Sequence, residues 1–203
     1  MMSIFVVAVL VGAAPGAPPH VAPPVPRAAF HDAMRKLWEE HVTWTRVYII
    51  SAVAGLPDAD QAAQRLLKNQ TDIGDAIKPF YGDAAGERLT GLLRGHILTA
   101  AKLITAAKGG DTAATSAASA AWYANADSIA TFLSAANPKH WSLATLKGGM
   151  HTHLDLTLKE ATARLHGDWV ADIAAYDQVH EHILGLADVL SNGIVAQFPA
   201  RFN

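Results

Sequence analysis

Two pairs of closely spaced histidines are the first residues in this chain that could do chemistry. His151 and His153 lie in GGMHTHLDL, and His180 and His182 lie in DQVHEHILG. Neutral imidazole is a common ligand for transition metals, and it also exchanges protons near neutral pH. The chain has ten histidines in 203 residues and no cysteine. Disulfides, iron–sulfur clusters and thiol nucleophiles are therefore excluded.

Counting along a helical hairpin predicts which of these histidines lie at the same height. Two antiparallel helices bring together residues that are equally far from the turn between them, with a rise of about 1.5 Å per residue. Across the tight turn HGDW, His153 is predicted to face His180, and His151 to face His182. Residues two apart on a helix point about 200° from each other, so only one histidine of each pair faces a common point. The apolar surroundings of His180 and His182 leave the choice between them open.

The same count extends the site to other helices. His41 is predicted to lie level with Asp72, and His96 to lie within about one turn of Asn125. Because these positions are near the middle of their helices, one polar layer inside the protein is expected. The predicted metal ligands are His41, Asp72, His96, His153, His180 and His182.

A transition metal ion (Zn, Cu or Fe) suits a set of imidazoles with one carboxylate. The Glu-x-x-His pairs of di-iron bundles are absent, and Ca²⁺ or Mg²⁺ would need more oxygen ligands. If the ion is catalytic, one coordination position stays open, and Asp72 or a water is the expected base. Whether the protein is an enzyme stays open, because neither a nucleophile elbow nor a phosphate-binding loop is present.

Two alternatives use the same histidines without a catalytic metal. Core histidines are usually hydrogen-bonded structural residues, so the layer is also consistent with a non-catalytic interaction module that responds to pH near 6.5. A heme or small-ligand carrier is the third hypothesis, without a c-type attachment motif, which would need cysteines.

The elements that position these residues are all predicted to be helices. Apolar residues recur at helical spacing from Phe30 onward, and glycine, proline or an N-capping residue separates the segments. The predicted helices span residues 30–54, 58–78, 84–107, 112–135, 142–165 and 169–194. Six helices with short connections, four of them about 25 residues long, predict an all-α up-and-down bundle that forms a single domain of residues 30–203.

The N-terminal residues 1–29 are predicted to be a signal-like apolar segment and a proline-rich linker. The apolar run from Ser3 to Ala14 has the length of a signal-peptide core and is too short to span a bilayer. A secreted or extracytoplasmic bacterial protein with no stable membrane span in its mature chain is therefore expected. The alternative is an apolar arm packed on the domain or on a neighbouring chain. A net charge of −2 without a basic patch argues against nucleic acid as a partner.

Several segments together resemble one protein family. They are LWEEHVTWTR, NQTDIGDAIKPFYG, LTGLLRGHI, WYANADSIATFL, HLDLTLKEATARL and GIVAQFPARF. They are similar to small exported bacterial proteins of unknown function that carry labels such as glycosyltransferase or acetylglutamate kinase. The resemblance implies no known reaction, and those two activities would need an α/β sheet and a phosphate cradle, which this sequence does not predict. Its pattern includes His41, Trp44, Arg46, Asp72, His96, Asn125 and His153.

Overall fold

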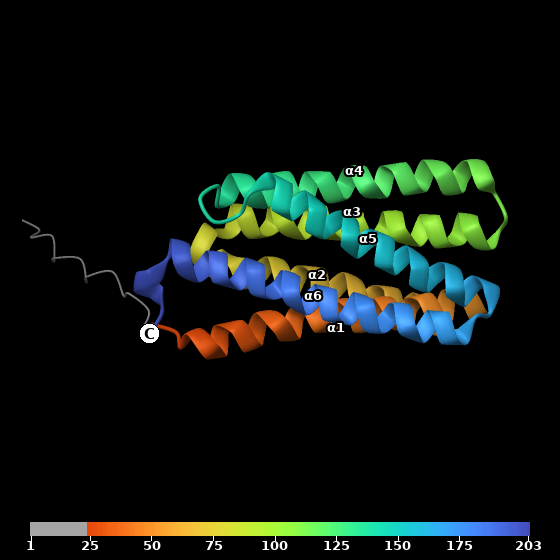
Figure 1. Cartoon of the computed structure of the whole chain (residues 1–203), viewed down its shortest axis with the longest axis horizontal. Coiled ribbons are helices and arrows are strands. Elements are labelled where there is room, and N and C mark those ends of the chain that lie inside the picture. Colours follow the sequence, from red (N-terminus) through yellow and green to blue (C-terminus); the bar gives the residue numbers. More distant parts are fainter. Residues whose placement is uncertain (1–23) are drawn as a thin grey trace, which may run out of the picture.

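A computed structural model describes residues 24–203, which form an all-α up-and-down bundle of six helices (Figure 1). The helices are α1 (Arg27–Ala54), α2 (Ala59–Tyr81), α3 (Asp83–Lys108), α4 (Thr112–Ala136), α5 (Leu143–His166) and α6 (Trp169–Gln197), followed by the 3-10 turn η1 (Pro199–Arg201). The predicted fold class is confirmed, although all six helices are long, from 23 to 29 residues. The signal-like segment of the sequence lies outside the described residues.

Local signals end and begin the helices where the sequence predicts. Gly55 ends α1 in the left-handed region at φ 68°, where a residue without Cβ is favoured. The side chains of Asp111, Ser142 and Asp168 accept hydrogen bonds from the first turns of α4, α5 and α6. The second helix is longer than the predicted 58–78, because α2 continues through Pro79 and ends at Tyr81, before Gly82. A proline in this last turn removes only one main-chain bond near the helix end.

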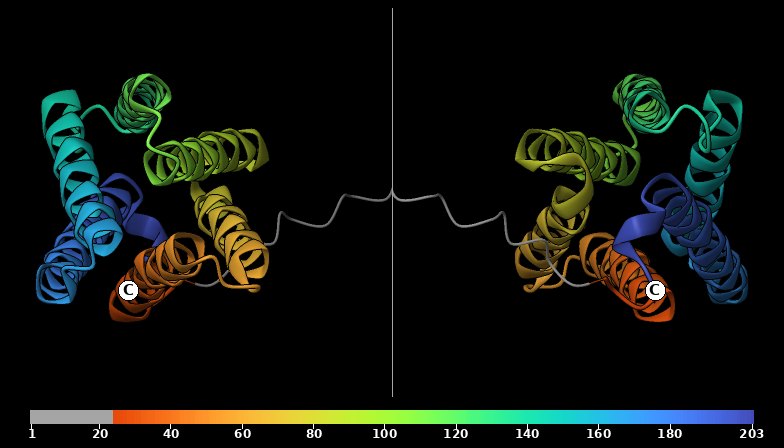
Figure 2. Two further views of the ribbon diagram at one scale, coloured as in Figure 1. Left: turned by 90° about the vertical axis from the view of Figure 1, so that its right-hand side faces the viewer. Right: turned by 90° about the vertical axis from the view of Figure 1, so that its left-hand side faces the viewer.

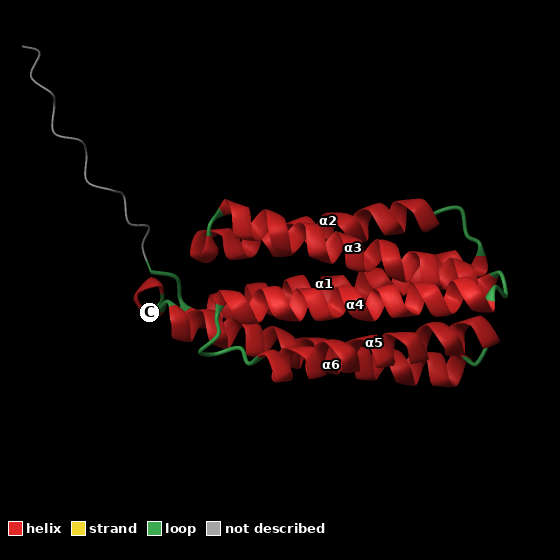
Figure 3. Ribbon diagram, turned by 90° about the horizontal axis from the view of Figure 1, so that it is seen from above, coloured by secondary structure: helices red, strands yellow, loops and turns green. Residues whose placement is uncertain are grey.

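The six helices form a closed ring around the core. Each helix packs on its neighbours in sequence, and α6 packs on α1 (Figure 2). Helix α1 also contacts α3 and α5 across the interior, whereas α4 and α5 diverge from their connecting loop (Figure 1). All helix connections lie at the two ends of the bundle (Figure 3). Residues in the middle of α1, α3 and α5 therefore meet inside.

The two ends of the described chain are held together. Val25 pairs with Phe202 in an isolated bridge, and Val25 N–H donates to the carbonyl of Arg201 at 2.9 Å. Val25 of the predicted linker therefore packs against the C-terminal segment, and residues 27–29 of that linker already belong to α1. Within residues 24–203, no helix combines the length and the apolar character that crossing a membrane would need.

Candidate functional site

Three buried imidazoles from three different helices meet inside the bundle. They are His41 of α1, His96 of α3 and His153 of α5, each at most 3% exposed. The ring centroid of His153 lies 5.6 Å from that of His41 and 6.3 Å from that of His96. We call these three residues the histidine cluster. The predicted convergence of imidazoles from separate helices is confirmed for them.

The hydrogen bonds of His96 are complete. Trp122 Nε1 donates to His96 Nε2 at 3.1 Å, and His96 Nδ1 lies 3.0 Å from Asn125 Oδ1. The predicted proximity of His96 and Asn125 is therefore confirmed. Both ring nitrogens are engaged by protein groups, so His96 has no lone pair left for a ligand.

His41 and His153 are less fully bonded. His41 Nδ1 lies 3.2 Å from Nε2 of Gln70, a fully buried residue of α2. His153 Nδ1 is buried and has no hydrogen-bond partner within residues 24–203. A buried polar atom without a partner is rare and costs about 1–3 kcal/mol. His153 is therefore where the cluster has unused bonding capacity.

Burial keeps the histidine cluster neutral. Removal from water lowers the pKa of His41 to about 3, with a smaller contribution from the neighbouring His96. Burial likewise lowers the pKa of His96 to about 4. The pKa of His153 lies well below its ordinary value, because the ring is buried and surrounded by other imidazoles. All three rings are thus uncharged at neutral pH.

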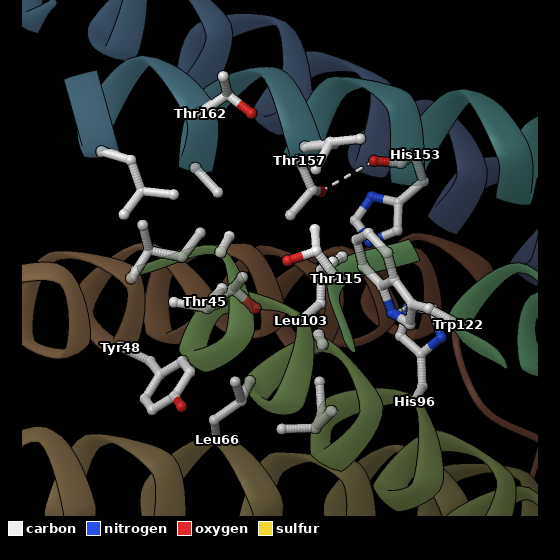
Figure 4. Close-up of a pocket in the computed structure, with 18 of the residues that line it drawn as sticks. Thr45, Tyr48, Leu66, His96, Leu103, Thr115, Trp122, His153, Thr157 and Thr162 are labelled. Atoms are coloured by element: carbon white, nitrogen blue, oxygen red, sulfur yellow. Dashed lines mark hydrogen bonds between the residues drawn. The ribbon is translucent and has the colours of Figure 1, made fainter. Parts of the chain in front are cut away.

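A cavity of about 120 Å³ borders the histidine cluster. Figure 4 shows His153, Trp122 and His96 together at one end, with Tyr48 and Thr162 toward the other. Most of the wall is apolar and includes Leu66, Ile97, Leu103, Ile104, Ala161 and Leu165. The exposed lining residues Leu158 and Thr162 belong to the second half of α5, where α5 has diverged from α4 (Figure 1). The cavity thus has one polar end and an apolar body.

The structure does not bring all predicted metal ligands together. Asp72 lies outside the histidine cluster, where it pairs with Lys68 at 2.7 Å and its side chain is 31% exposed. His180 points outward to Glu39 at 3.0 Å. His182 rather than His180 lies beside His153, with 6.3 Å between ring centroids.

His182 and His151 have protein partners of their own. His182 Nε2 lies 2.9 Å from the carbonyl oxygen of Gly149, on the adjacent helix α5. His151 contacts Asp127 of α4 at 2.9 Å, so the predicted facing of His151 and His182 is not observed. The mirror-image pairing of the two histidine pairs is therefore wrong in register.

The geometry gives limited support for a metal centre. Within residues 24–203, no group of three or more His, Cys, Asp or Glu side chains is arranged to hold a metal ion. His41, His96 and His153 are close, but both nitrogens of His96 are already bonded.

A second buried polar region lies on the same helices. Arg46 of α1 donates to Glu160 of α5 at 2.8 Å and to both oxygens of Asp172 of α6 at 2.8 and 3.1 Å, and Arg164 donates to Asp172 at 3.1 Å. We call these four residues the ion-pair network. Arg46 therefore pairs with two buried carboxylates at once.

Burial and pairing act in opposite directions on the two carboxylates. Burial raises the pKa of Glu160 to about 7, against the opposing hydrogen bond from Arg46. Burial would also raise the pKa of Asp172, but hydrogen bonds from Arg46 and Arg164 hold it below the ordinary value. Each carboxyl group is 1% exposed and is paired with a guanidinium group, and none of the four residues lines the cavity.

Sequence reasoning missed two partners of the histidine cluster. Gln70 lies two residues before Asp72, which was expected at its place, and Trp122 lies one turn before Asn125. The role of Trp122 as a hydrogen-bond donor could have been predicted, because a buried indole N–H needs an acceptor and Trp122 shares a helix face with the polar residue Asn125. The cavity itself has no sequence signal.

Searches for related proteins give no functional assignment. No known protein family, no curated protein and no solved structure matches this chain.

Proposed function

We propose that this protein is a carrier for a small, uncharged and mostly apolar molecule, which it holds in the cavity beside the histidine cluster. The observation that carries the proposal is an otherwise apolar cavity lined in part by His153, a residue whose Nδ1 has no partner in residues 24–203. A bound molecule with one polar group would fill the space and satisfy that nitrogen.

The size and charge of the cavity support such a ligand. Cavities of about 150 Å³ lined by aliphatic side chains stay dry in other proteins and bind benzene or xenon. The cavity here, at about 120 Å³, is of similar size, which favours a single-ring molecule over heme. No Asp, Glu, Lys or Arg of the described chain lines it. A charged ligand would lose its hydration without gaining an opposite charge.

Benzene binding tests the proposal, with two neighbouring alanines as a matched pair. Ala100 lines the cavity, whereas Ala101, also half-buried on α3, does not. Benzene is expected to raise the melting temperature of the wild type and of Ala101→Leu in proportion to its concentration. Ala100→Leu should abolish this response, because the added side chain takes up cavity volume. A wild-type melting temperature that benzene leaves unchanged would refute the carrier function.

A transition metal bound by the same histidines is the second candidate function. Its support is the 5.6 Å separation of the His41 and His153 rings together with the unpartnered His153 nitrogen. A third imidazole would come from His96, which would first give up its bond from Trp122, or from His182, whose ring lies 6.3 Å from that of His153. Zn, Cu or Fe would fit these nitrogen donors.

Metal analysis decides this second candidate. Protein purified without a histidine tag is expected to hold about one ion per chain, and the double variant His41→Ala, His96→Ala to hold none. Absence of ions, with no change in melting temperature on adding Zn, Cu, Fe or Ni salts, would reject the metal function and leave the carrier proposal intact.

We also propose export from a bacterial cell. The support is the apolar run from Ser3 to Ala14 followed by small residues and prolines, all outside the described residues. When the chain recovered from the culture medium is sequenced from its N-terminus, its first residue should lie after this run. Recovery of the intact N-terminus from the cytoplasm would contradict export.

A further inference from the structure

The protonation of His96 follows from its neighbours. The Trp122 indole N–H can only donate, so the His96 Nε2 that it reaches must be the unprotonated nitrogen. The proton of the neutral ring is then on Nδ1 and is donated to Asn125 Oδ1. Asn125 Nδ2 donates to the carbonyl of Leu92 at 3.1 Å, which fixes the orientation of its amide. His96 is therefore a saturated member of the cluster.

The same reasoning assigns His41. Gln70 Nε2 lies 2.8 Å from the carbonyl of Leu66. Because a carbonyl oxygen can only accept, the amide atom that faces it must be the nitrogen. Its hydrogens are shared among Leu66, Asn69 Oδ1 and His41 Nδ1. His41 Nδ1 faces a donor and must accept, so the proton of the neutral ring is on Nε2.

His153 combines a place on the cavity wall with a ring nitrogen that has no partner in residues 24–203. A neutral imidazole has one donor nitrogen and one acceptor nitrogen. In one tautomer the ring nitrogen that meets the ligand needs a donor from it, and in the other it needs an acceptor. A hydroxyl group serves either tautomer, whereas an ether or ketone serves only one and a hydrocarbon serves neither.

The rest of the cavity wall restricts the ligand further. Leu103, Ile104 and Leu165 provide a body that suits hydrocarbon, and the described lining residues include no charged side chain to balance a carboxylate or an ammonium group. A water molecule would satisfy His153 but would leave the apolar body unfilled, which stays empty in comparable cavities.

We propose that the ligand is an uncharged single-ring phenol or alcohol whose hydroxyl group bonds to the imidazole of His153 and whose ring fills the apolar body of the cavity. This inference rests on the proposed carrier function. It adds the chemical class of the ligand and the residue that selects it.

Calorimetric titration of the full chain with phenol and toluene tests this specificity. The two molecules have nearly the same shape, and only phenol has a hydroxyl group. His153→Leu should weaken phenol relative to toluene by about tenfold, because one buried hydrogen bond is lost. The ratio of the phenol and toluene dissociation constants is compared between the variant and the wild type, so that the different hydration of the two molecules cancels. His151→Leu, on the same helix but outside the cavity lining, should leave that ratio unchanged.

The outcomes separate this inference from the carrier proposal. If both molecules bind and His153→Leu leaves their ratio unchanged, selection of a hydroxyl group by His153 is refuted and the carrier function stands. If neither molecule binds to the wild type, both fail.

The unsubstituted chain provides a second measurement, which does not depend on the folding of His153→Leu. In a long-range ¹⁵N spectrum of the imidazoles, phenol should shift the His153 resonances and toluene should shift them much less. Equal shifts from the two molecules would overturn the inference.

Discussion

The ion-pair network and the histidine cluster are both buried between α1 and α5, yet they differ in how completely their polar atoms are bonded. In the network, two guanidinium groups hold two carboxyl groups at 2.8 to 3.1 Å. In the cluster, three neutral rings leave one buried nitrogen without a partner, beside a cavity of about 120 Å³.

This difference separates a structural role from a binding role. The charges of the network are paired with one another, and none of its four residues lines the cavity. An unpaired group beside a void costs stability in the empty protein, and that cost is recovered when a ligand binds. The predictions below test this contrast.

The largest expected effect is a loss of stability in acid. The folded-state pKa values of the three clustered histidines are lowered, so the unfolded chain takes up protons first as the pH falls below about 6.5. Each histidine should then cost roughly 1.4 kcal/mol per pH unit, down to the folded pKa values of about 3 for His41 and about 4 for His96. Urea unfolding from pH 8 to pH 4 measures this slope. A profile that stays flat below pH 6 would contradict neutral buried rings.

Glu160 of the ion-pair network should contribute to the pH profile with the opposite sign. The pKa of Glu160 is raised to about 7 from an ordinary value of 4.5, so its contribution to stability is present at low pH and is lost as the pH rises through 7. Glu160→Gln removes this contribution and should steepen the loss in acid between pH 7 and 4.5. His153→Leu should make the loss shallower. If the free energy of unfolding has the same slope against pH in both variants and in the wild type, Glu160 and His153 do not act with opposite sign.

Breaking the ion-pair network should produce the next largest effect. Arg46→Met leaves Glu160 without a partner and Asp172 with only Arg164, and the loss of one partner of a buried pair costs about 3–5 kcal/mol. Urea unfolding at pH 8 measures the loss. Arg35→Met, which breaks an exposed pair with Asp188, is the control and should change stability little. Equal effects would show that the network is not structural.

Two histidine substitutions should differ although both rings are buried. His96→Leu leaves the Trp122 indole N–H and Asn125 Oδ1 without their partner, at a cost of about 1–3 kcal/mol. His153→Leu removes an unpartnered nitrogen and should cost less, or stabilise the empty protein. Unfolding at pH 8 keeps titration out of the comparison. A larger cost for His153→Leu would indicate that its nitrogen has a partner in solution.

The smallest effect is expected at Asp72, which was predicted as a ligand. Because Asp72 pairs with Lys68 at the surface, Asp72→Asn should change stability by no more than about 0.5 kcal/mol and leave benzene binding unchanged. Loss of benzene binding in this variant would show that Asp72 is part of the binding site.

The fold was predictable because its signals are local. Gly55, Asp111, Ser142 and Asp168 mark helix ends through their own backbone and capping preferences. The helices between them follow from the spacing of apolar residues, and short connections make neighbours antiparallel.

The site was predictable only where height and facing agree. Counting from a turn fixes height to within about one helical turn, and this was sufficient for His96 and Asn125. Two residues that are two positions apart on a helix differ by only about 3 Å in height but by about 200° in direction. The count therefore selected Asp72 where Gln70 faces His41, and His180 where His182 lies beside His153. The cavity depends on how far α4 and α5 diverge, which no local signal specifies.

Diffraction from crystals of the full chain under xenon pressure tests the central contrast most directly. Xenon enters apolar cavities without needing a polar partner. We expect a xenon peak within the cavity, against Leu103 and next to His153, and none beside Glu160 in the ion-pair network. A cavity closed by its own side chains, with no xenon between α1, α3 and α5, would contradict the claim that this end of the bundle is built to hold a ligand.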